Sequence, residues 1–145
     1  MRSPDQGKRT TSRKFDGKNY PIDFADGYPL LSLSLQSLEA LNKKLKTPVS
    51  IHHFRPNIVI DGSEPHIEDK IKEFSIGDFR FSSRKNCTRC SIITVNPKTG
   101  EKNNEVMQEL LKSRKSEKGV IFGQNLTHQN NGTIAVGQSL EKLEF

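Results

Sequence analysis

The sequence predicts a β-rich α+β domain, in which short strands form a barrel and a few short helices pack beside them. Three observations support this fold class. Short apolar segments rich in β-branched residues recur along the chain with turn residues between them. Two further segments place their apolar residues at helical spacing. The chain has 145 residues, enough for one domain with one substantial core.

The first twenty residues differ in composition from the rest. They hold six basic and two acidic residues, a net of +4 out of the chain's +6. The segment is polar and lacks the periodicity of a helix or strand, which predicts a flexible basic arm over residues 1–20. The low hydrophobic content of the whole chain, 32%, agrees with an arm outside the core. The folded domain is expected to cover residues 21–145.

The first elements of the domain are a strand and a helix. An apolar strand is expected over Tyr28–Leu33, and Ser34 can cap a helix by accepting a hydrogen bond from a free backbone N–H. The helix shows leucines at helical spacing on one face, at Leu35, Leu38, Leu41 and Leu45. Pro48 must end this helix at or before Thr47.

Short strands and turns follow. Asn57–Ile60 is a compact β-branched strand that Asp61-Gly62 turns. The acidic segment Glu64–Lys72 is expected to form a loop or a short helical turn. Ser75–Asp78 then turns into the alternating segment Phe79–Phe81.

The last third of the chain again alternates short strands and turns with one helix. The expected elements are a strand at Ser91–Val95 closed by the turn Asn96–Gly100, a helix at Asn104–Ser113, and strands at Gly119–Gly123 and Thr133–Gly137 with an Asn-rich turn between them. In the helix, Val106 and Leu110 are expected to face the core, with Met107 and Leu111 beside them.

Several function classes lack their signatures. The sequence contains no Gly-x-Ser-x-Gly, His-Glu-x-x-His, Walker A or Gly-x-Gly-x-x-Gly motif. It has no apolar run of roughly 18 residues that would span a membrane, and no apolar signal-peptide core at its start. The positive net charge of the chain favours an anionic partner. With no Trp and only two Tyr to stack on bases, no nucleic acid is expected.

Cys87-x-x-Cys90 is the first candidate site, and its spacing permits four interpretations. A zinc site needs four ligands, and His52 and His53 would point to opposite faces of an extended chain. A redox-active pair would precede a helix, whereas a β-branched segment follows here. The two remaining interpretations are a pair of small buried thiols, and one thiolate on a transition metal whose other ligands come from a cofactor.

Arg89, inside this motif, and Arg55 and Asn57, upstream, bear on the last interpretation. A guanidinium can hold a phosphate through two hydrogen bonds, and an Asn amide offers both a donor and an acceptor to the edge of a heterocycle. Taken alone, such arginines are commonly solvated surface residues. Together with a cysteine they suit an anionic, heterocyclic ligand that carries a metal.

Several segments resemble the motifs of MOSC domains. Phe54–Ile60 reads FRPNIVI, Cys87–Gly100 reads CTRCSIITVNPKTG, Phe122–Gln124 reads FGQ and Asn131–Gly137 reads NGTIAVG. These motifs occur in the family's order, and the likeness covers roughly residues 23–143. The chain departs from the pattern at Asn96 and Gln138, where the family usually has aspartate. The resemblance implies a MOSC-type β-barrel.

Within this family the strongest likeness is to the amidoxime-reducing enzymes, which use molybdenum with a pyranopterin to reduce N-hydroxylated compounds. The resemblance implies that Cys90 is the metal ligand and the catalytic residue. It implies that Arg55, Asn57, Thr88 and Arg89 bind the pterin and its phosphate. It further implies a small N-hydroxylated substrate and electrons from cytochrome b5 and cytochrome b5 reductase.

Two other functions are compatible with the resemblance. The chain is also similar to the C-terminal domain of molybdenum cofactor sulfurases, whose full-length members are linked to pyridoxal phosphate, so it could carry the cofactor or take part in sulfur transfer. The third alternative is a folded remnant without activity. The amidoxime-reducing members imply the mitochondrial outer membrane, whereas the lack of an anchor pattern in this chain would otherwise imply the cytoplasm.

Overall fold

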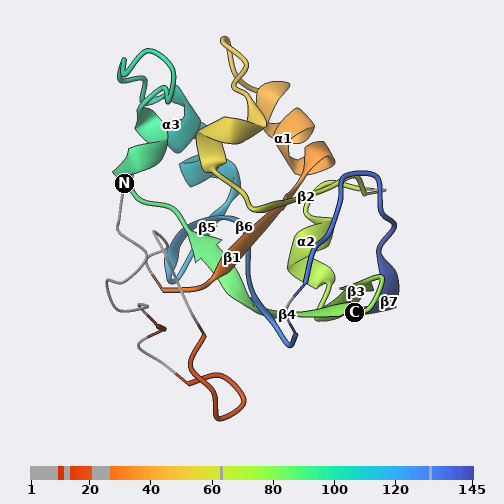
Figure 1. Ribbon diagram of the computed structural model, residues 1–145. Helices are drawn as coiled ribbons and strands as arrows, with labels where there is room; N and C mark the ends of the chain where they lie inside the picture. Colours follow the sequence, from red (N-terminus) through yellow and green to blue (C-terminus); the bar gives the residue numbers. More distant parts are fainter. Residues whose placement is uncertain (1–9, 12–13, 21–26, 63, 131) are drawn as a thin grey trace.

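The computed structural model describes residues 10–11, 14–20, 27–62, 64–130 and 132–145 (Figure 1). Its centre is one sheet with the strand order β2-β1-β6-β4-β3-β7, and β5 pairs separately with β6. The strands are β1 (Leu30–Ser34), β2 (Ile58–Ile60), β3 (Glu73–Ile76), β4 (Phe79–Thr88), β5 (Lys115–Ser116), β6 (Gly119–His128) and β7 (Glu141–Glu144). All pairs are antiparallel except β1 with β2, which are joined through helices.

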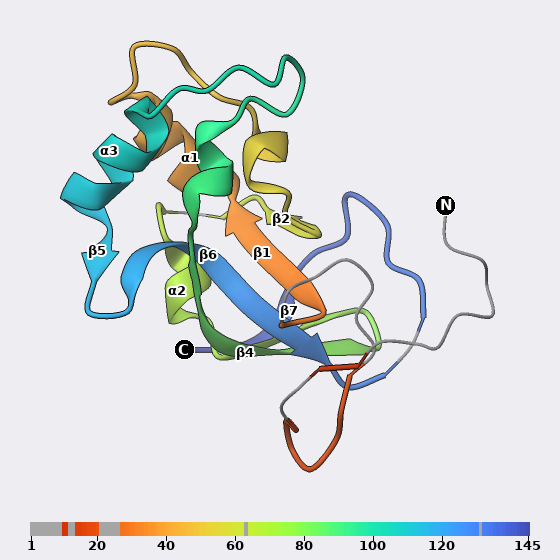
Figure 2. The same cartoon turned by 90° about the vertical axis from the view of Figure 1, so that its left-hand side faces the viewer.

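The sheet curls strongly into a half-barrel (Figures 1 and 2). Its two longest strands, β4 and β6, pair along most of their length, and their register shifts twice, between Ser83 and Lys85 and between Asn86 and Thr88. Such bulges bend a strand and increase its twist. Because both bulges lie in the central pair, they curl the whole sheet. The predicted β-rich α+β class is confirmed.

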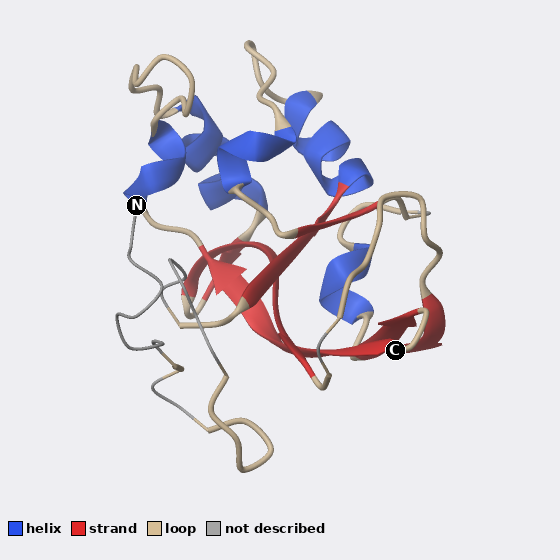
Figure 3. Ribbon diagram, viewed as in Figure 1, coloured by secondary structure: helices blue, strands red, loops and turns tan. Residues whose placement is uncertain are grey.

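The helices gather mostly at one end of the sheet (Figure 3). They are α1 (Leu35–Asn42), α3 (Glu105–Ser113) and the 3₁₀ helices η1 (Ile51–Phe54) and η2 (Ser91–Thr94), while α2 (Ile67–Lys70) lies apart from them. The four helices, with β1 and β6, bury the first core cluster: Leu33, Leu38, Leu41, Leu45, Phe54, Ile93, Val106, Leu110, Val120 and Phe122. No helix of the described residues is both long and apolar enough to cross a membrane.

The predicted cap of α1 is confirmed. The Ser34 hydroxyl accepts a hydrogen bond from the backbone N–H of Ser37 at 3.1 Å. The helix ends at Asn42, five residues before the limit set by Pro48, because the Asn42 side chain pairs with both backbone groups of Val49 at 2.9 Å. This pairing folds the following loop back toward the helix and brings η1 to the end of β1.

A second core cluster lies between α2 and the β3–β4 hairpin. It consists of Ile58, Ile60, Ile67, Ile71, Phe74, Ile76, Phe81 and Leu126. Phe74 and Phe81 face each other across the β3–β4 pair with stacked rings, 5.0 Å between centroids. The segment Glu64–Lys72, for which a loop or short helical turn was expected, contains the single helical turn of α2.

Two predicted strands are wrong. Ser91–Val95 is not a strand, because Ser91–Thr94 turns into η2, which buries Ile93 in the core and leaves Ile92 52% exposed. Thr133–Gly137 forms no strand among its described residues, and its Val136 is fully exposed. The strand predicted at Gly119–Gly123 is longer than expected and continues as β6 to His128. The histidine pair at 52 and 53 lies in η1 rather than on an extended chain.

The described part of the N-terminal segment contacts the domain. Asp16 forms an ion pair with Arg84 of β4, and the ring of Tyr20 meets the ring of His128 edge-on at 5.8 Å. Residues 1–9 and 12–13 of the predicted arm lie outside the described residues. The division at residue 20 remains a prediction.

Candidate functional site

The five residues predicted to form the site border one cavity. Its volume is about 680 Å³, and Arg55, Asn57, Thr88, Arg89 and Cys90 all line it. They come from two places in the fold: the connection between η1 and β2, and the end of β4 with the two residues that follow it. The curl of the sheet brings these two segments together, although thirty residues lie between Asn57 and Thr88 in the sequence. A cavity of this size suits a cofactor.

The segment from Arg55 to Asn57 is held against the start of β1. Arg55 ends η1 with a left-handed backbone, φ 53°, which turns the chain sharply toward β2. Asn57 then hydrogen-bonds Leu31 twice: its backbone N–H donates to the Leu31 carbonyl, and its side-chain Oδ1 accepts from the Leu31 N–H, both at 2.8 Å. The amide Nδ2 of Asn57 has no hydrogen-bond partner among the described residues, so it can donate to a ligand.

Arg89 forms part of the cavity wall. Its Nε donates to the Phe122 carbonyl at 2.8 Å and its Nη1 to the Phe54 carbonyl at 3.1 Å, and the guanidinium lies 5.5 Å from the centre of the Phe54 ring. Burial lowers the pKa of Arg89 from its ordinary value, an effect that nearby Cys87 and Cys90 oppose. The remaining nitrogen, Nη2, is buried and has no partner in the described part of the chain. Arg89 therefore joins η1 to β6 and leaves a positive charge behind the cavity.

Gly123 makes room for this arginine. It lies in β6 at the second register shift, where β6 has one residue more than β4, and its backbone has φ 85°. A Cβ at this position would come within 2.8 Å of the Ser32 carbonyl oxygen and 3.3 Å of the Arg89 Nη2. Only glycine adopts this backbone without strain and lets β1 and the guanidinium approach so closely. This explains the glycine of the FGQ motif.

The two cysteines are free and differ in exposure. Cys90 is exposed and immediately precedes η2, whereas Cys87 is partly buried near the end of β4. Burial raises the pKa of the Cys87 thiol above its ordinary value, although Arg89 and Lys85 oppose the shift. The described residues contain no cluster of three or more His, Cys, Asp and Glu that could hold a metal. A metal here would need ligands from outside these residues.

The lining of the cavity is positively charged. Arg55, Lys85 and Arg89 line it, and none of its described lining residues is acidic. Lys85 was missed by the sequence analysis; its ammonium lies 5.2 Å from the centre of the Tyr28 ring at the same cavity. The strand alternation could have indicated it, because Lys85 and Cys87 are two residues apart and share a face of β4. A lining of this kind favours an anionic ligand.

The difference between the cysteines predicts selective alkylation. We expect iodoacetamide at pH 7.5 to modify Cys90 at least about tenfold faster than Cys87, since the thiolate is the reactive form and Cys87 combines partial burial with a raised pKa. Peptide mapping by mass spectrometry over time would measure both rates in one sample. Equal rates would contradict the arrangement of the two thiols.

Comparison with known proteins shows the family of the chain. A family model described as MOSC domain matches residues 19–141. Mitochondrial amidoxime-reducing component 1 of Mus musculus is 41% identical over 125 residues, which cover 80% of this chain and 37% of that protein; the Homo sapiens protein is 40% identical with the same coverage. Molybdenum cofactor sulfurase of Arabidopsis thaliana is 34% identical over 120 residues, 74% of this chain and 15% of that protein. The chain thus spans well under half the length of these relatives. It belongs to the MOSC domain family.

Proposed function

We propose that this chain binds a molybdenum cofactor in the 680 Å³ cavity and forms part of an oxidoreductase that reduces N-hydroxylated compounds. One observation carries the proposal: the exposed thiol of Cys90 shares a cavity with three basic side chains and no acidic one among its described lining residues. The names of relatives that contain the same region, an amidoxime-reducing component and a molybdenum cofactor sulfurase, support the class of cofactor.

The residues present fit a pyranopterin cofactor with its phosphate. Such a group is anionic, and the positively charged lining offsets its charge. Arg55 is exposed and its side chain makes no hydrogen bond or ion pair within the described residues, so its guanidinium can hold the phosphate. The buried Nη2 of Arg89 lacks a partner, which leaves part of its charge uncompensated until an anion occupies the cavity.

Each predicted residue has a role in this proposal. Cys90 would hold the metal through its thiolate, because a soft sulfur ligand suits a transition metal of this kind. Arg55 and Thr88 bind the phosphate, and Arg89 contributes its charge from the wall. Asn57 binds the pterin edge or the substrate through its unpartnered Nδ2. When bound, the molybdenum centre would supply two electrons that, with two protons, convert an N–OH group to N–H and water.

The basic surface of the chain also agrees with an acidic electron donor. With a net charge of +6, the protein would attract an acidic partner and speed their encounter. We propose cytochrome b5, itself reduced by cytochrome b5 reductase, as that donor. The evidence for this partner is the likeness to the amidoxime-reducing relatives and the charge.

The test is elemental and enzymatic. The chain expressed in a host that makes the cofactor is expected to contain about one molybdenum per chain, measured by mass spectrometry of the purified protein. Reduction of benzamidoxime is then measured with NADH, cytochrome b5 and its reductase. A folded chain with neither molybdenum nor fluorescent pterin would refute the proposed function and support a remnant without cofactor.

The sulfurase relative supports a second candidate. Its 34% identity over 74% of this chain is compatible with a domain that carries the cofactor or takes part in sulfur transfer without reducing a substrate. Cofactor in the purified chain without reduction of benzamidoxime would favour this alternative over the oxidoreductase.

A further inference from the structure

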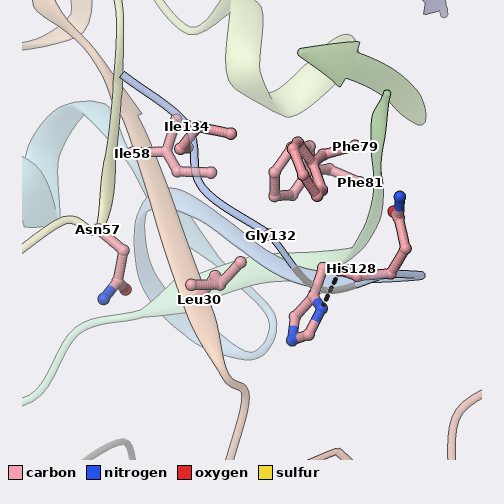
Figure 4. A pocket seen from close by; sticks show the side chains of 9 residues that line it. Leu30, Asn57, Ile58, Phe79, Phe81, His128, Gly132 and Ile134 are labelled. Carbon is pink, nitrogen blue, oxygen red and sulfur yellow. Dashed lines mark hydrogen bonds between the residues drawn. The ribbon is translucent and has the colours of Figure 1, made fainter. Parts of the chain in front are cut away.

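A second cavity lies beside the first. Its volume is about 300 Å³, and it shares two lining residues, Leu30 and Asn57, with the larger cavity. Figure 4 shows it from close by, with Leu30 on β1, Phe79 and Phe81 on β4, and the chain around Gly132 and Ile134 passing along it. The two cavities therefore meet at Leu30, the first residue of β1, and at Asn57 just before β2.

The walls of the smaller cavity are apolar. Ile58 and Phe81 belong to the second core cluster and are buried, and Leu30 and Phe79 pack against that cluster. Ile134, which is 38% exposed, also lines the cavity. Among the lining residues the polar ones are Asn57, His128 and Asn130. The cavity suits an apolar group of about the size of a substituted aromatic ring.

Asn130 fixes the chain just after β6, on one side of the smaller cavity. The Asn130 side chain donates to the Asp78 carbonyl at 2.8 Å and accepts from the Arg80 N–H at 3.2 Å, while its carbonyl accepts from His128 Nδ1 at 2.9 Å. These bonds tie the end of β6 to the β3–β4 turn. They hold the following segment beside the cavity, so the cavity exists before a ligand arrives.

Gly132 allows this segment to lie against the aromatic wall. A Cβ at this position would overlap the ring of Phe79. The contact between Gly132 and Phe79 therefore requires the absence of a side chain. It places the Phe79 ring, which lines the cavity, next to Gly132, two residues before Ile134.

We propose that the smaller cavity binds the apolar, aryl-sized end of the N-hydroxylated substrate, with the polar end lying across Leu30 and Asn57 toward the cavity of Cys90. This inference rests on the proposed function. The two residues that line both cavities support this orientation of the substrate. Leu30 would contact its apolar end, and the unpartnered Nδ2 of Asn57 can donate to the nitrogen or oxygen of its polar end. The site thus selects aryl amidoximes over small alkyl ones.

The binding test uses the full chain without cofactor, so that it does not depend on molybdenum. We expect benzamidoxime to shift the methyl NMR signals of Leu30, Ile58 and Ile134 in a saturable way. Acetamidoxime, which replaces the ring by a methyl group, is expected to bind at least about tenfold more weakly, since it buries far less apolar area. Equal affinities, shifts confined to residues of the larger cavity, or no binding of benzamidoxime would each overturn the inference.

A matched pair of variants locates the site. Ile134→Trp fills the cavity and is expected to weaken benzamidoxime binding at least about tenfold, as it removes the space for the ring. Val136→Trp adds the same bulk two residues away, where the side chain is fully exposed, and is expected to leave binding unchanged. Thermal unfolding would confirm that both variants fold. Equal binding by both variants would place the ligand elsewhere.

The two proposals can fail separately. Aryl-selective binding by a chain that never acquires molybdenum would keep the cavity as an apolar ligand site and refute the reductase. Molybdenum in a chain that binds the two amidoximes equally would keep the cofactor site and refute the aryl cavity.

Discussion

Replacing Cys90 by serine is expected to leave the chain folded and to lower its molybdenum content at least about tenfold, since a neutral hydroxyl is a poor substitute for a thiolate on this metal. The side chain is exposed, so the change should alter the free energy of unfolding by no more than about 0.5 kcal/mol. Molybdenum per chain and urea unfolding would be measured on the same preparation.

Cys87→Ser is the matched control. The same exchange three residues earlier affects a partly buried thiol on the same cavity. It is expected to keep most of the molybdenum and to cost about 1 kcal/mol of stability, because a hydroxyl replaces a partly desolvated thiol. If Cys90→Ser retained as much metal as the wild type, or if only Cys87→Ser lost it, Cys90 would not be the ligand.

Arg89→Leu is expected to have the largest effect on stability, a loss of about 2–4 kcal/mol in the free energy of unfolding. The change removes the two hydrogen bonds that join the Phe54 carbonyl of η1 to the Phe122 carbonyl of β6. It also removes the contact with the Phe54 ring. Arg89→Lys keeps the charge but cannot bridge both carbonyls, so it should recover only part of the stability. Denaturant unfolding of the cofactor-free chain measures both.

Arg55→Ala provides the contrast. Arg55 is exposed and its side chain has no hydrogen bond or ion pair with a described residue. Its removal should change stability by no more than about 0.5 kcal/mol. Cofactor affinity, in contrast, should fall about tenfold through the loss of a charge-assisted contact. If Arg55→Ala destabilised the chain as much as Arg89→Leu, our assignment would be wrong. That assignment makes Arg89 a structural residue of the cavity wall and Arg55 a residue that binds the ligand.

Local patterns predicted several of the elements but not β3, β5 or β7. The leucine spacing and Ser34 located α1, the Val106–Leu110 spacing located α3, and the β-branched run Ile58–Ile60 is β2. These patterns succeed because each is created by burial of one face of one element. They failed at Ser91–Val95, where β-branched residues are compatible with a strand but the core accepts only Ile93 from a 3₁₀ turn. They failed again at Thr133–Gly137, whose Val136 packs against nothing.

The sequence by itself determined the chemistry of the site: a Cys, two Arg, an Asn and a Thr within motifs that resemble those of MOSC domains. Only the tertiary structure decided where the side chains of these residues lie and what they contact. Nothing in the sequence distinguishes the exposure of Arg55 from that of Arg89. In the structure, the bulge at Gly123 lets the Arg89 guanidinium lie buried against two carbonyls, whereas the left-handed turn at Arg55 leaves its guanidinium in solvent. Likewise, Leu30 and Asn57 became the boundary between two cavities only because the curled sheet brings β1, β4 and β6 around them. Exposure and hydrogen-bond partners depend on residues distant in the chain, and no local pattern records them.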